Sequence, residues 1–146
     1  MKFHCSFHDS KNLYFLLELA PRGSLANFLR REPFVTLKKA QAITAEIVAA
    51  LEYLRSEQIA HRDLKPGNIL FDENYHIKLC DFATAKVFNQ NLAAKIPKKT
   101  PVDINNAEED RINSFVGTEE YVSPEVITDK ASGYEADLWS LGVILY

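Results

Sequence analysis

The strongest constraint on the fold of this 146-residue chain is a polar octapeptide, His61–Asn68, that separates a helical pattern from two strand patterns. From Thr36 to about Glu57, apolar residues recur at the spacing of a helix with one buried face, and Thr36 is suited to cap that helix. After the octapeptide, Ile69–Phe71 and His76–Cys80 are expected to form two short strands joined by a turn. The octapeptide is therefore predicted to be a loop held between a long helix and a hairpin.

The N-terminal part of the chain has a different pattern. Lys2–Phe7 and Asn12–Leu19 are expected to form two strands joined by a turn, and the second is nearly continuous in apolar residues, as is typical of a strand covered on both faces. A Pro-Arg-Gly sequence then ends the strand pattern, and Ser24 is suited to cap a short helix, Leu25–Arg30.

The remainder of the chain is less regular. Residues 81–125 are predicted to be largely irregular, and the charge runs of Asn89–Arg111 to be solvated surface rather than a binding patch. A loop this long inside a compact domain is usually functional or disordered. The chain begins inside a strand pattern and stops inside the apolar segment Leu141–Tyr146 without a helix stop signal, which we interpret as an incomplete domain.

Composition excludes few classes of protein but is useful for partners and location. With 47% hydrophobic and 25% charged residues and a formal net charge of -3, the chain has no field that would attract nucleic acid or a membrane surface. No segment resembles a signal peptide or is long and apolar enough for direct membrane insertion. Cys5 and Cys80 show no metal-ligand spacing, so we expect reduced core thiols in a cytoplasmic protein.

Four polar side chains carry the candidate chemistry. Asp63 supplies a carboxylate in the loop, Lys65 an ammonium two residues later, and Asn68 a carbonyl oxygen suited to a hard cation. Because the strands after the loop pair as a hairpin, Asn68 and Asp81 at their outer ends are expected to lie close together. A proton acceptor, a cation and two metal ligands form the set that phosphoryl transfer needs.

The motifs along the chain resemble those of the protein kinase domain. The sequence HRDLKPGN is similar to the kinase catalytic loop, and Asp81–Ala83 to the DFG element. Ser123–Glu125 resembles the end of the activation segment, and Asp137–Gly142 the start of the helix that follows. The resemblance implies an α+β, protein-kinase-like fold that is incomplete. It divides residues 1–146 into N-lobe strands (1–19), a hinge (20–23) and a C-lobe portion (24–146) with activation segment 81–125.

The resemblance also implies roles for individual residues. Asp63 matches the catalytic base, and Lys65 the lysine that contacts the transferring phosphate. Asn68 and Asp81 match the magnesium ligands, so that ATP and Mg2+ are the expected cofactors. Further ATP-binding positions are matched by Leu17, Glu18, Ala20, Ser24 and Leu70, with Leu17 as gatekeeper, Glu18 to Ala20 as the segment whose backbone binds adenine, and Leu70 beneath the adenine ring. His61 and Phe82 match a buried stack between the lobes, and Asp137 a carboxylate that fixes the catalytic-loop backbone.

One segment points to a narrower group. Residues 112–127 (INSFVGTEEYVSPEVI) are similar to the 3-phosphoinositide-dependent protein kinase family, upstream kinases that activate other kinases. This resemblance, with Lys65 and residues 117–118, implies transfer to Ser or Thr of protein substrates, possibly other kinases. It makes Ser114 the activation-loop phosphorylation site. A phosphate on Ser114 would pair with Arg62 and order the loop.

Three departures from the family pattern leave other interpretations open. The glycine-rich loop, its lysine and the partner glutamate would lie before Met1, much of the C-terminal half would follow Tyr146, and Ala83 replaces the DFG glycine. Because alanine resists angles that glycine adopts, switching at residue 83 is expected to be restricted. We therefore expect this polypeptide alone to be inactive. The alternatives are a non-catalytic, kinase-like docking module and a truncated gene product.

Overall fold

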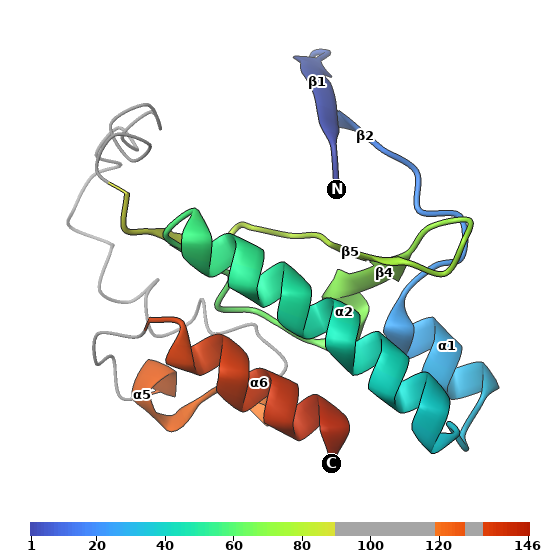
Figure 1. The fold of residues 1–146 in the computed structure, drawn as a ribbon. Helices are drawn as coiled ribbons and strands as arrows, with labels where there is room; N and C mark the ends of the chain where they lie inside the picture. The colour runs from blue at the N-terminus through green and yellow to red at the C-terminus, as the bar shows by residue number, and fades with distance from the viewer. Residues whose placement is uncertain (90–118, 128–132) are drawn as a thin grey trace.

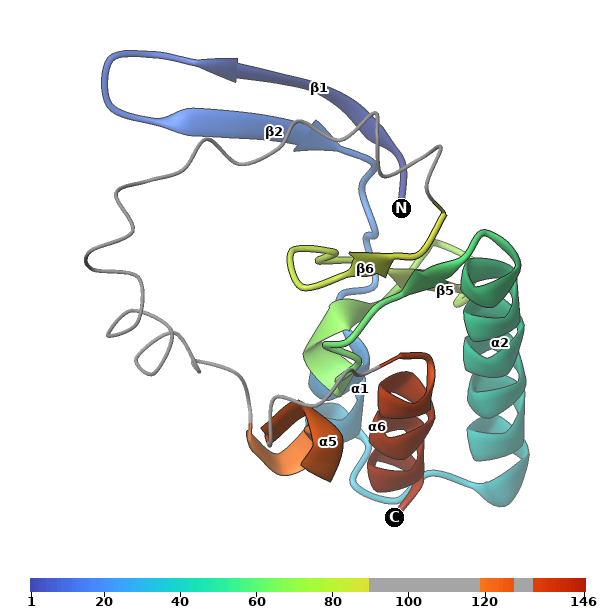
Figure 2. The ribbon, with the colours of Figure 1, turned by 90° about the vertical axis from the view of Figure 1, so that its left-hand side faces the viewer.

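The computed structural model describes residues 1–89, 119–127 and 133–146, and it combines small antiparallel sheets with helices (Figures 1 and 2). The elements in chain order are β1 (Phe3–His8), β2 (Leu13–Leu17), α1 (Leu25–Arg31), α2 (Leu37–Ser56), β3 (Ile59–Ala60), η1 (Pro66–Asn68), β4 (Ile69–Phe71), β5 (Ile77–Leu79), β6 (Lys86–Val87), η3 (Glu119–Tyr121), α5 (Pro124–Ile127) and α6 (Glu135–Leu145). This arrangement confirms the α+β class. No helix in the described ranges has both the length and the hydropathy that crossing a bilayer requires.

Strands β1 and β2 form an antiparallel hairpin whose turn is fixed by Asp9. The Asp9 carboxylate accepts hydrogen bonds from the backbone N–H groups of Lys11 and Asn12, both at 2.7 Å, and from the Tyr14 hydroxyl at 2.8 Å. The Lys11 N–H bond has the largest effect, and together these bonds lower the pKa of the Asp9 carboxyl. Both strands lie within one or two residues of the predicted limits.

The predicted burial of this hairpin is wrong for the part of the chain that the structure describes. Every residue of β2 is exposed, including Phe15 at 61%, and Cys5 on β1 is exposed rather than a core thiol. The reason is visible in both ribbon views, where the hairpin stands away from the helices and no described element packs on its faces (Figures 1 and 2).

Both helix caps predicted from the sequence are confirmed. The Ser24 hydroxyl oxygen accepts a hydrogen bond from the Asn27 N–H at 3.2 Å at the start of α1. The Thr36 hydroxyl oxygen does the same for the Lys39 N–H at 3.4 Å at the start of α2. Capping satisfies amide donors that have no partner inside a helix, so the local sequence fixes where each helix begins.

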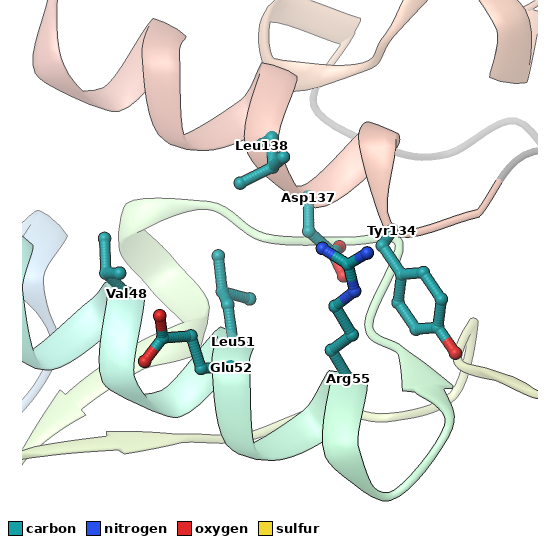
Figure 3. Close-up of a pocket in the computed structure, with 7 residues that line it drawn as sticks. All are labelled: Val48, Leu51, Glu52, Arg55, Tyr134, Asp137 and Leu138. Atoms are coloured by element: carbon teal, nitrogen blue, oxygen red, sulfur yellow. The ribbon is translucent and has the colours of Figure 1, made fainter.

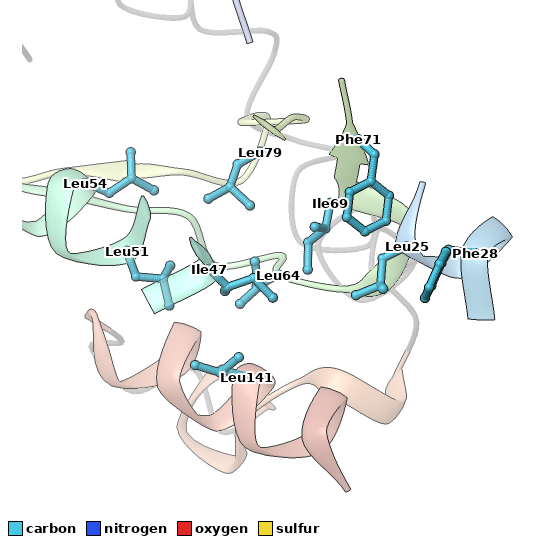
Figure 4. Close-up of a cluster of buried hydrophobic side chains, with 10 residues drawn as sticks. All are labelled: Leu25, Phe28, Ile47, Leu51, Leu54, Leu64, Ile69, Phe71, Leu79 and Leu141. Atoms are coloured by element: carbon cyan, nitrogen blue, oxygen red, sulfur yellow. The ribbon is translucent and has the colours of Figure 1, made fainter. Parts of the chain in front are cut away.

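The hydrophobic core joins α1, α2, the β4–β5 hairpin and α6 (Figure 4). Its buried members are Leu25, Phe28, Ile47, Leu51, Leu54, Leu64, Ile69, Phe71, Leu79 and Leu141. Three of them, Ile47, Leu51 and Leu54, lie on the predicted apolar face of the long helix α2. Leu64 lies within the polar loop itself and has no exposed surface. The loop backbone is thereby anchored in the core, while its polar side chains project from it.

The short strands form two further antiparallel pairs. Strands β4 and β5 pair with Ile69 opposite Leu79, as the predicted hairpin requires. Strands β3 and β6 pair with Ile59 opposite Val87, a contact that the sequence does not predict. A strand of two residues is too short to show an alternating pattern, so only the tertiary structure reveals this pair.

Candidate active site

The backbone of the polar loop is held by a buried carboxylate on α6. Asp137, only 3% exposed, accepts hydrogen bonds from the N–H of His61 at 2.8 Å and of Arg62 at 2.7 Å. These contacts confirm the expected loop-fixing role of Asp137. They also hold Arg62 at a φ of 68°, in the left-handed region that side chains other than glycine rarely adopt.

Burial has an opposing effect on the same carboxyl group. Removal from water raises the pKa of Asp137 above its ordinary value, because a low-dielectric site disfavours the charged form. The hydrogen bonds from the Arg62 and His61 N–H groups act in the other direction and favour the carboxylate. The loop is therefore tied to α6 by two hydrogen bonds that offset part of the cost of burying the Asp137 carboxylate.

Three of the predicted site residues form one hydrogen-bonded cluster. The Lys65 ammonium lies 2.8 Å from the Asp63 Oδ2, and the Asn68 Nδ2 donates to both the backbone oxygen and the Oδ2 of Asp63, each at 2.9 Å. The side chains of Asp63 and Lys65 are 22% and 23% exposed, so they lie at the mouth of the loop. The cluster presents a carboxylate and an ammonium to the solvent while Asn68 is buried beneath them.

Asp81 lies next to this cluster without joining it. The Asn68 backbone oxygen accepts hydrogen bonds from the Cys80 N–H at 3.0 Å and the Cys80 Sγ at 3.4 Å. Because Asp81 directly follows Cys80, its backbone lies beside Asn68. Burial first, and then the charge of Asp81, raise the pKa of the Cys80 thiol. Asp81 has a φ of 62° and is exposed, and in the described ranges no hydrogen bond or ion pair links its carboxylate to the cluster.

The donor set of Asn68 and Asp81 is chemically suited to magnesium. Because the Asn68 amide nitrogen is directed at Asp63, its amide oxygen lies on the other branch of the side chain. An amide oxygen and a carboxylate are hard ligands, and Mg2+ is commonly held by one or two such groups together with substrate phosphates. Within the described residues no three His, Cys, Asp or Glu side chains gather to form a complete protein metal site.

The residue pair expected to stack between the lobes is in contact. The rings of His61 and Phe82 have centroids 4.7 Å apart, and His61 has no exposed surface. The predicted burial of the stack is wrong for Phe82, which is 42% exposed because no described element covers its outer face. The His61 Nδ1 accepts from the Asp63 N–H at 3.3 Å, so Nε2 carries the proton and donates to the Cys80 oxygen at 3.0 Å. His61 thus links the loop to the segment that begins at Asp81.

The alanine that replaces the DFG glycine fits the backbone without strain. Among the described residues, positive φ angles occur at Gln58, Arg62, Tyr75, Asp81 and, among glycines, Gly23. Ala83 is not one of them, so the conformation seen here does not need a glycine at that position. The expected restriction on switching remains a prediction.

The residues predicted to bind ATP are divided between two places. Ser24 and Leu70 lie side by side in an isolated antiparallel bridge. Glu18 is tied to β5 by an ion pair with Lys78 at 2.9 Å, which lowers the pKa of Glu18 and raises that of Lys78. Leu17 lies at the exposed end of β2, and Ala20, partly buried, belongs to the connection that follows it.

Three supporting contacts were not predicted from the sequence. Glu46 on α2 accepts hydrogen bonds from the Ile77 N–H and pairs with His76 Nδ1, both at 2.8 Å, and so anchors β5. Glu46 also raises the pKa of His76, chiefly through their hydrogen bond. The Thr84 hydroxyl donates to the His61 oxygen at 3.2 Å. Glu46 lies within a helix, and nothing in its neighbouring sequence indicates partners 30 and 31 positions away.

Of the predicted regulatory pair Ser114 and Arg62, the structure describes Arg62. Ser114 and residues 117–118 lie outside the described residues. Arg62 is partly buried, and its Nε is buried and has no hydrogen-bond partner among the described residues. The hydroxyl of Ser123, which is 1% exposed, likewise has no partner within the described ranges.

A separate cavity of about 200 Å3 lies between α2 and α6 (Figure 3). It is lined by Val48, Leu51, Glu52, Arg55, Tyr134, Asp137 and Leu138. The Arg55 guanidinium lies over the Tyr134 ring, 5.6 Å from its centroid. Asp63, Lys65 and Asn68 do not line this cavity, although Asp137, which holds the loop, does.

The polar loop held by α6, the carboxylate–ammonium–amide cluster and the neighbouring aspartate have the order and proximity expected for the catalytic segments of a protein kinase domain. The chain belongs to the protein kinase domain family, whose model matches residues 1–146.

Its relatives include named protein kinases. Over 146 residues, all of this chain, it is 42% identical to 3-phosphoinositide-dependent protein kinase B of Dictyostelium discoideum, covering 15% of that protein. It is also 42% identical to 3-phosphoinositide-dependent protein kinase 1 of Homo sapiens, covering 24%, and 40% identical to serine/threonine-protein kinase PKH2 of Saccharomyces cerevisiae, covering 13%. The chain therefore spans about a quarter or less of the length of these relatives.

Proposed function

We propose that the protein containing this chain is a serine/threonine protein kinase that transfers the terminal phosphoryl group of ATP to protein hydroxyls. The observation that carries the proposal is the hydrogen-bonded cluster of Asp63, Lys65 and Asn68, held in place by Asp137. The similarity to relatives named as serine/threonine kinases supports the acceptor class.

The cluster suggests a division of work between its members. Asp63 accepts the proton of the attacking substrate hydroxyl. The hydroxyl oxygen forms a bond to the terminal phosphorus of ATP as the bond between that phosphorus and the leaving ADP breaks. Lys65, 2.8 Å from Asp63, supplies positive charge beside the transferring group. The hydrogen bonds from Asn68 fix the direction in which the Asp63 carboxylate points. Catalysis in this scheme is positioning and electrostatics, with no covalent enzyme intermediate.

Cofactor binding is assigned to residues around the cluster. Asn68 and Asp81 would hold magnesium through their oxygens, and magnesium supplies charge neutralisation for the phosphates when it is bound. The adenosine part of ATP would contact Leu17, Leu70, the backbone of Glu18 and Ala20, and Ser24 at the ribose. The bridge between Ser24 and Leu70 supports a common location for the contacts that these two residues would make.

Finer parts of the proposal rest on the named relatives. We infer a cytoplasmic kinase that acts on other kinases and is regulated by phosphorylation of Ser114. The buried Arg62 Nε has no acceptor in the part of the chain that the structure describes, and this supports the proposed regulation because an incoming phosphate would supply one. Similarity to 3-phosphoinositide-dependent protein kinases over all 146 residues supports the choice of substrate class.

The 146-residue polypeptide by itself is proposed to be inactive. None of its five glycines lies in a glycine-rich phosphate-binding sequence, so half of the ATP-positioning apparatus is absent from it. The exposed faces of β1 and β2 support the alternative that this chain acts as a docking module. A pure preparation of the polypeptide that phosphorylates a generic basic protein would contradict inactivity.

The test of the kinase proposal uses the protein encoded by the complete transcript that contains this chain. Phosphate transfer from radiolabelled ATP to a generic basic protein is measured for the wild type and for Asp63→Asn. Loss of the proton acceptor should lower the rate by about 10²–10⁴-fold. The matched control, Glu73→Gln, removes a carboxylate from an exposed turn and should leave the rate unchanged. Equal rates for Asp63→Asn and the wild type would exclude the proposed mechanism.

A further inference from the structure

Three arginine side chains surround one hollow beside α1. Arg22 comes from the connection that precedes α1 (Figure 1), and Arg30 and Arg31 come from its last turn. The hollow is about 370 Å3 in volume, and its other lining residues are Pro21, Gly23 and Asn27. All the charged side chains around it are therefore guanidinium groups.

Neutral acceptors hold these guanidinium groups in place. Arg30 donates to the backbone oxygen of Ala26 and to the amide oxygen of Asn27. Arg31 donates to the backbone oxygens of Asn27 at 3.2 Å and of Arg22 at 3.4 Å. Each of these two side chains uses only part of its five N–H donors, so donors remain for a ligand.

The third arginine is fixed by a different set of contacts. The Arg22 Nε donates to the Glu73 backbone oxygen at 3.5 Å, and its guanidinium lies 4.9 Å from the centroid of the Tyr75 ring. These contacts use one of the five donors and one face of the group. The remaining edge is available at the hollow.

No carboxylate neutralises the three charges in the described part of the chain, where every ion pair involves a lysine or a histidine. The nearest acidic residue in the sequence, Glu32, pairs with Lys39 at 2.5 Å instead. Basic residues in a last helical turn are favoured by the helix dipole, which accounts for Arg30 and Arg31. That effect does not account for Arg22, which adds a third like charge from another segment.

The hollow adjoins the candidate active site through the backbone. The Arg22 N–H donates to the Phe71 oxygen at 3.3 Å, and the Phe71 N–H donates to the Gly23 oxygen at 2.9 Å. These bonds attach the arginine-bearing connection to β4, next to the bridge between Ser24 and Leu70. A protein segment bound at the hollow would therefore lie beside the Ser24–Leu70 bridge.

We propose that this hollow binds the phosphate of a phosphorylated side chain on a partner protein segment. Guanidinium groups match the geometry of phosphate oxygens through paired N–H bonds, and a dianion balances the cluster better than a single carboxylate does. A concave cluster suits one compact anion, whereas a membrane presents a plane of headgroups. The proposed kinase activity assigns no role to Arg22, Arg30 or Arg31, and binding here does not depend on it.

The test measures binding by fluorescence anisotropy with the whole 146-residue chain. The probes are a labelled short peptide of Gly, Ala and Ser containing one phosphoserine, and the same peptide with serine or glutamate in its place. The phosphopeptide should bind at least about tenfold more tightly than either. Arg30→Gln/Arg31→Gln should abolish this preference, while the control Lys11→Gln/Lys38→Gln, which removes equal charge, should retain it.

A conservative pair of substitutions separates phosphate recognition from a general positive field. Arg30→Lys/Arg31→Lys keeps the charge but removes the planar forks, so it should also weaken phosphopeptide binding about tenfold. Retained affinity in this variant would overturn the proposal. So would arginine-dependent sedimentation with phosphatidylcholine–phosphatidylserine vesicles without any preference for the phosphopeptide. Thermal unfolding checks that each variant is folded. If a variant is not folded, Arg22→Gln replaces it, and the same loss of phosphopeptide binding is expected.

Discussion

At the scale of single residues, the polar loop keeps its conformation through Asp137. Its two oxygens accept the N–H groups of His61 and Arg62, and Arg62 has a left-handed backbone. Such angles cost about 1–3 kcal/mol and persist only where the surroundings impose them. The loop conformation is therefore expected to fail first when Asp137 is changed.

Replacement of Asp137 by asparagine should destabilise the chain. The amide keeps one acceptor oxygen but places an NH2 group against the second backbone N–H, so a buried donor loses its partner. The expected loss is about 1–3 kcal/mol in the free energy of unfolding, measured by urea denaturation. The control Ser56→Ala, at the exposed end of α2, should change stability by less. An equal effect of the two substitutions would contradict the role of Asp137.

The pH dependence of stability tests the same residue. Because the pKa of Asp137 is raised by burial, the folded chain binds this proton more tightly than the unfolded chain does. This contribution is fully present below the ordinary value of 3.8 and is lost as the pH rises through the raised value. The stability of the wild type relative to Asp137→Asn should therefore decrease as the pH rises above about 3.8. An increase over that window, measured by denaturation at a series of pH values, would contradict it.

At the scale of elements, features set by neighbouring residues could be predicted from the sequence, whereas features set by tertiary contacts could not. Ser24 and Thr36 fix helix starts through bonds within three residues, and both starts were predicted. The β3–β6 pair and the Glu46 anchor depend on residues about 30 positions apart, and neither was predicted. The burial expected for β2 was wrong because it depends on a covering layer, which periodicity alone does not supply.

The same distinction applies to the candidate site. The hydrogen-bonded contacts among Asp63, Lys65 and Asn68 follow from their spacing within one loop, which the core fixes at Leu64. Asp81 was expected beside them because a hairpin joins its segment to Asn68, and the backbone contact with Cys80 agrees. The direction of the Asp81 carboxylate depends on its own backbone angles, which no motif spacing determines.

The core residue inside the loop gives an element-scale prediction. Leu64 is fully buried among residues of α1, α2 and β4, so Leu64→Ala removes packing and leaves a cavity. The expected cost is about 2–5 kcal/mol in the free energy of unfolding. The matched change Leu37→Ala, at a residue 74% exposed, should cost far less in the same denaturation series. A small effect at Leu64 would mean that the loop is not held by the core.

At the scale of the whole molecule, we propose that Asn68 and Asp81 bring one metal–nucleotide complex to Asp63 and Lys65. The most direct measurement is the affinity of the protein from the complete transcript for Mn2+–ATP, followed by electron paramagnetic resonance. Asn68→Ala and Asp81→Asn should each weaken binding of the complex at least about tenfold, because each removes a metal ligand. The control Asn74→Ala, in the β4–β5 turn, should bind as the wild type does. Wild-type affinity in either the Asn68 or the Asp81 variant would contradict a shared site.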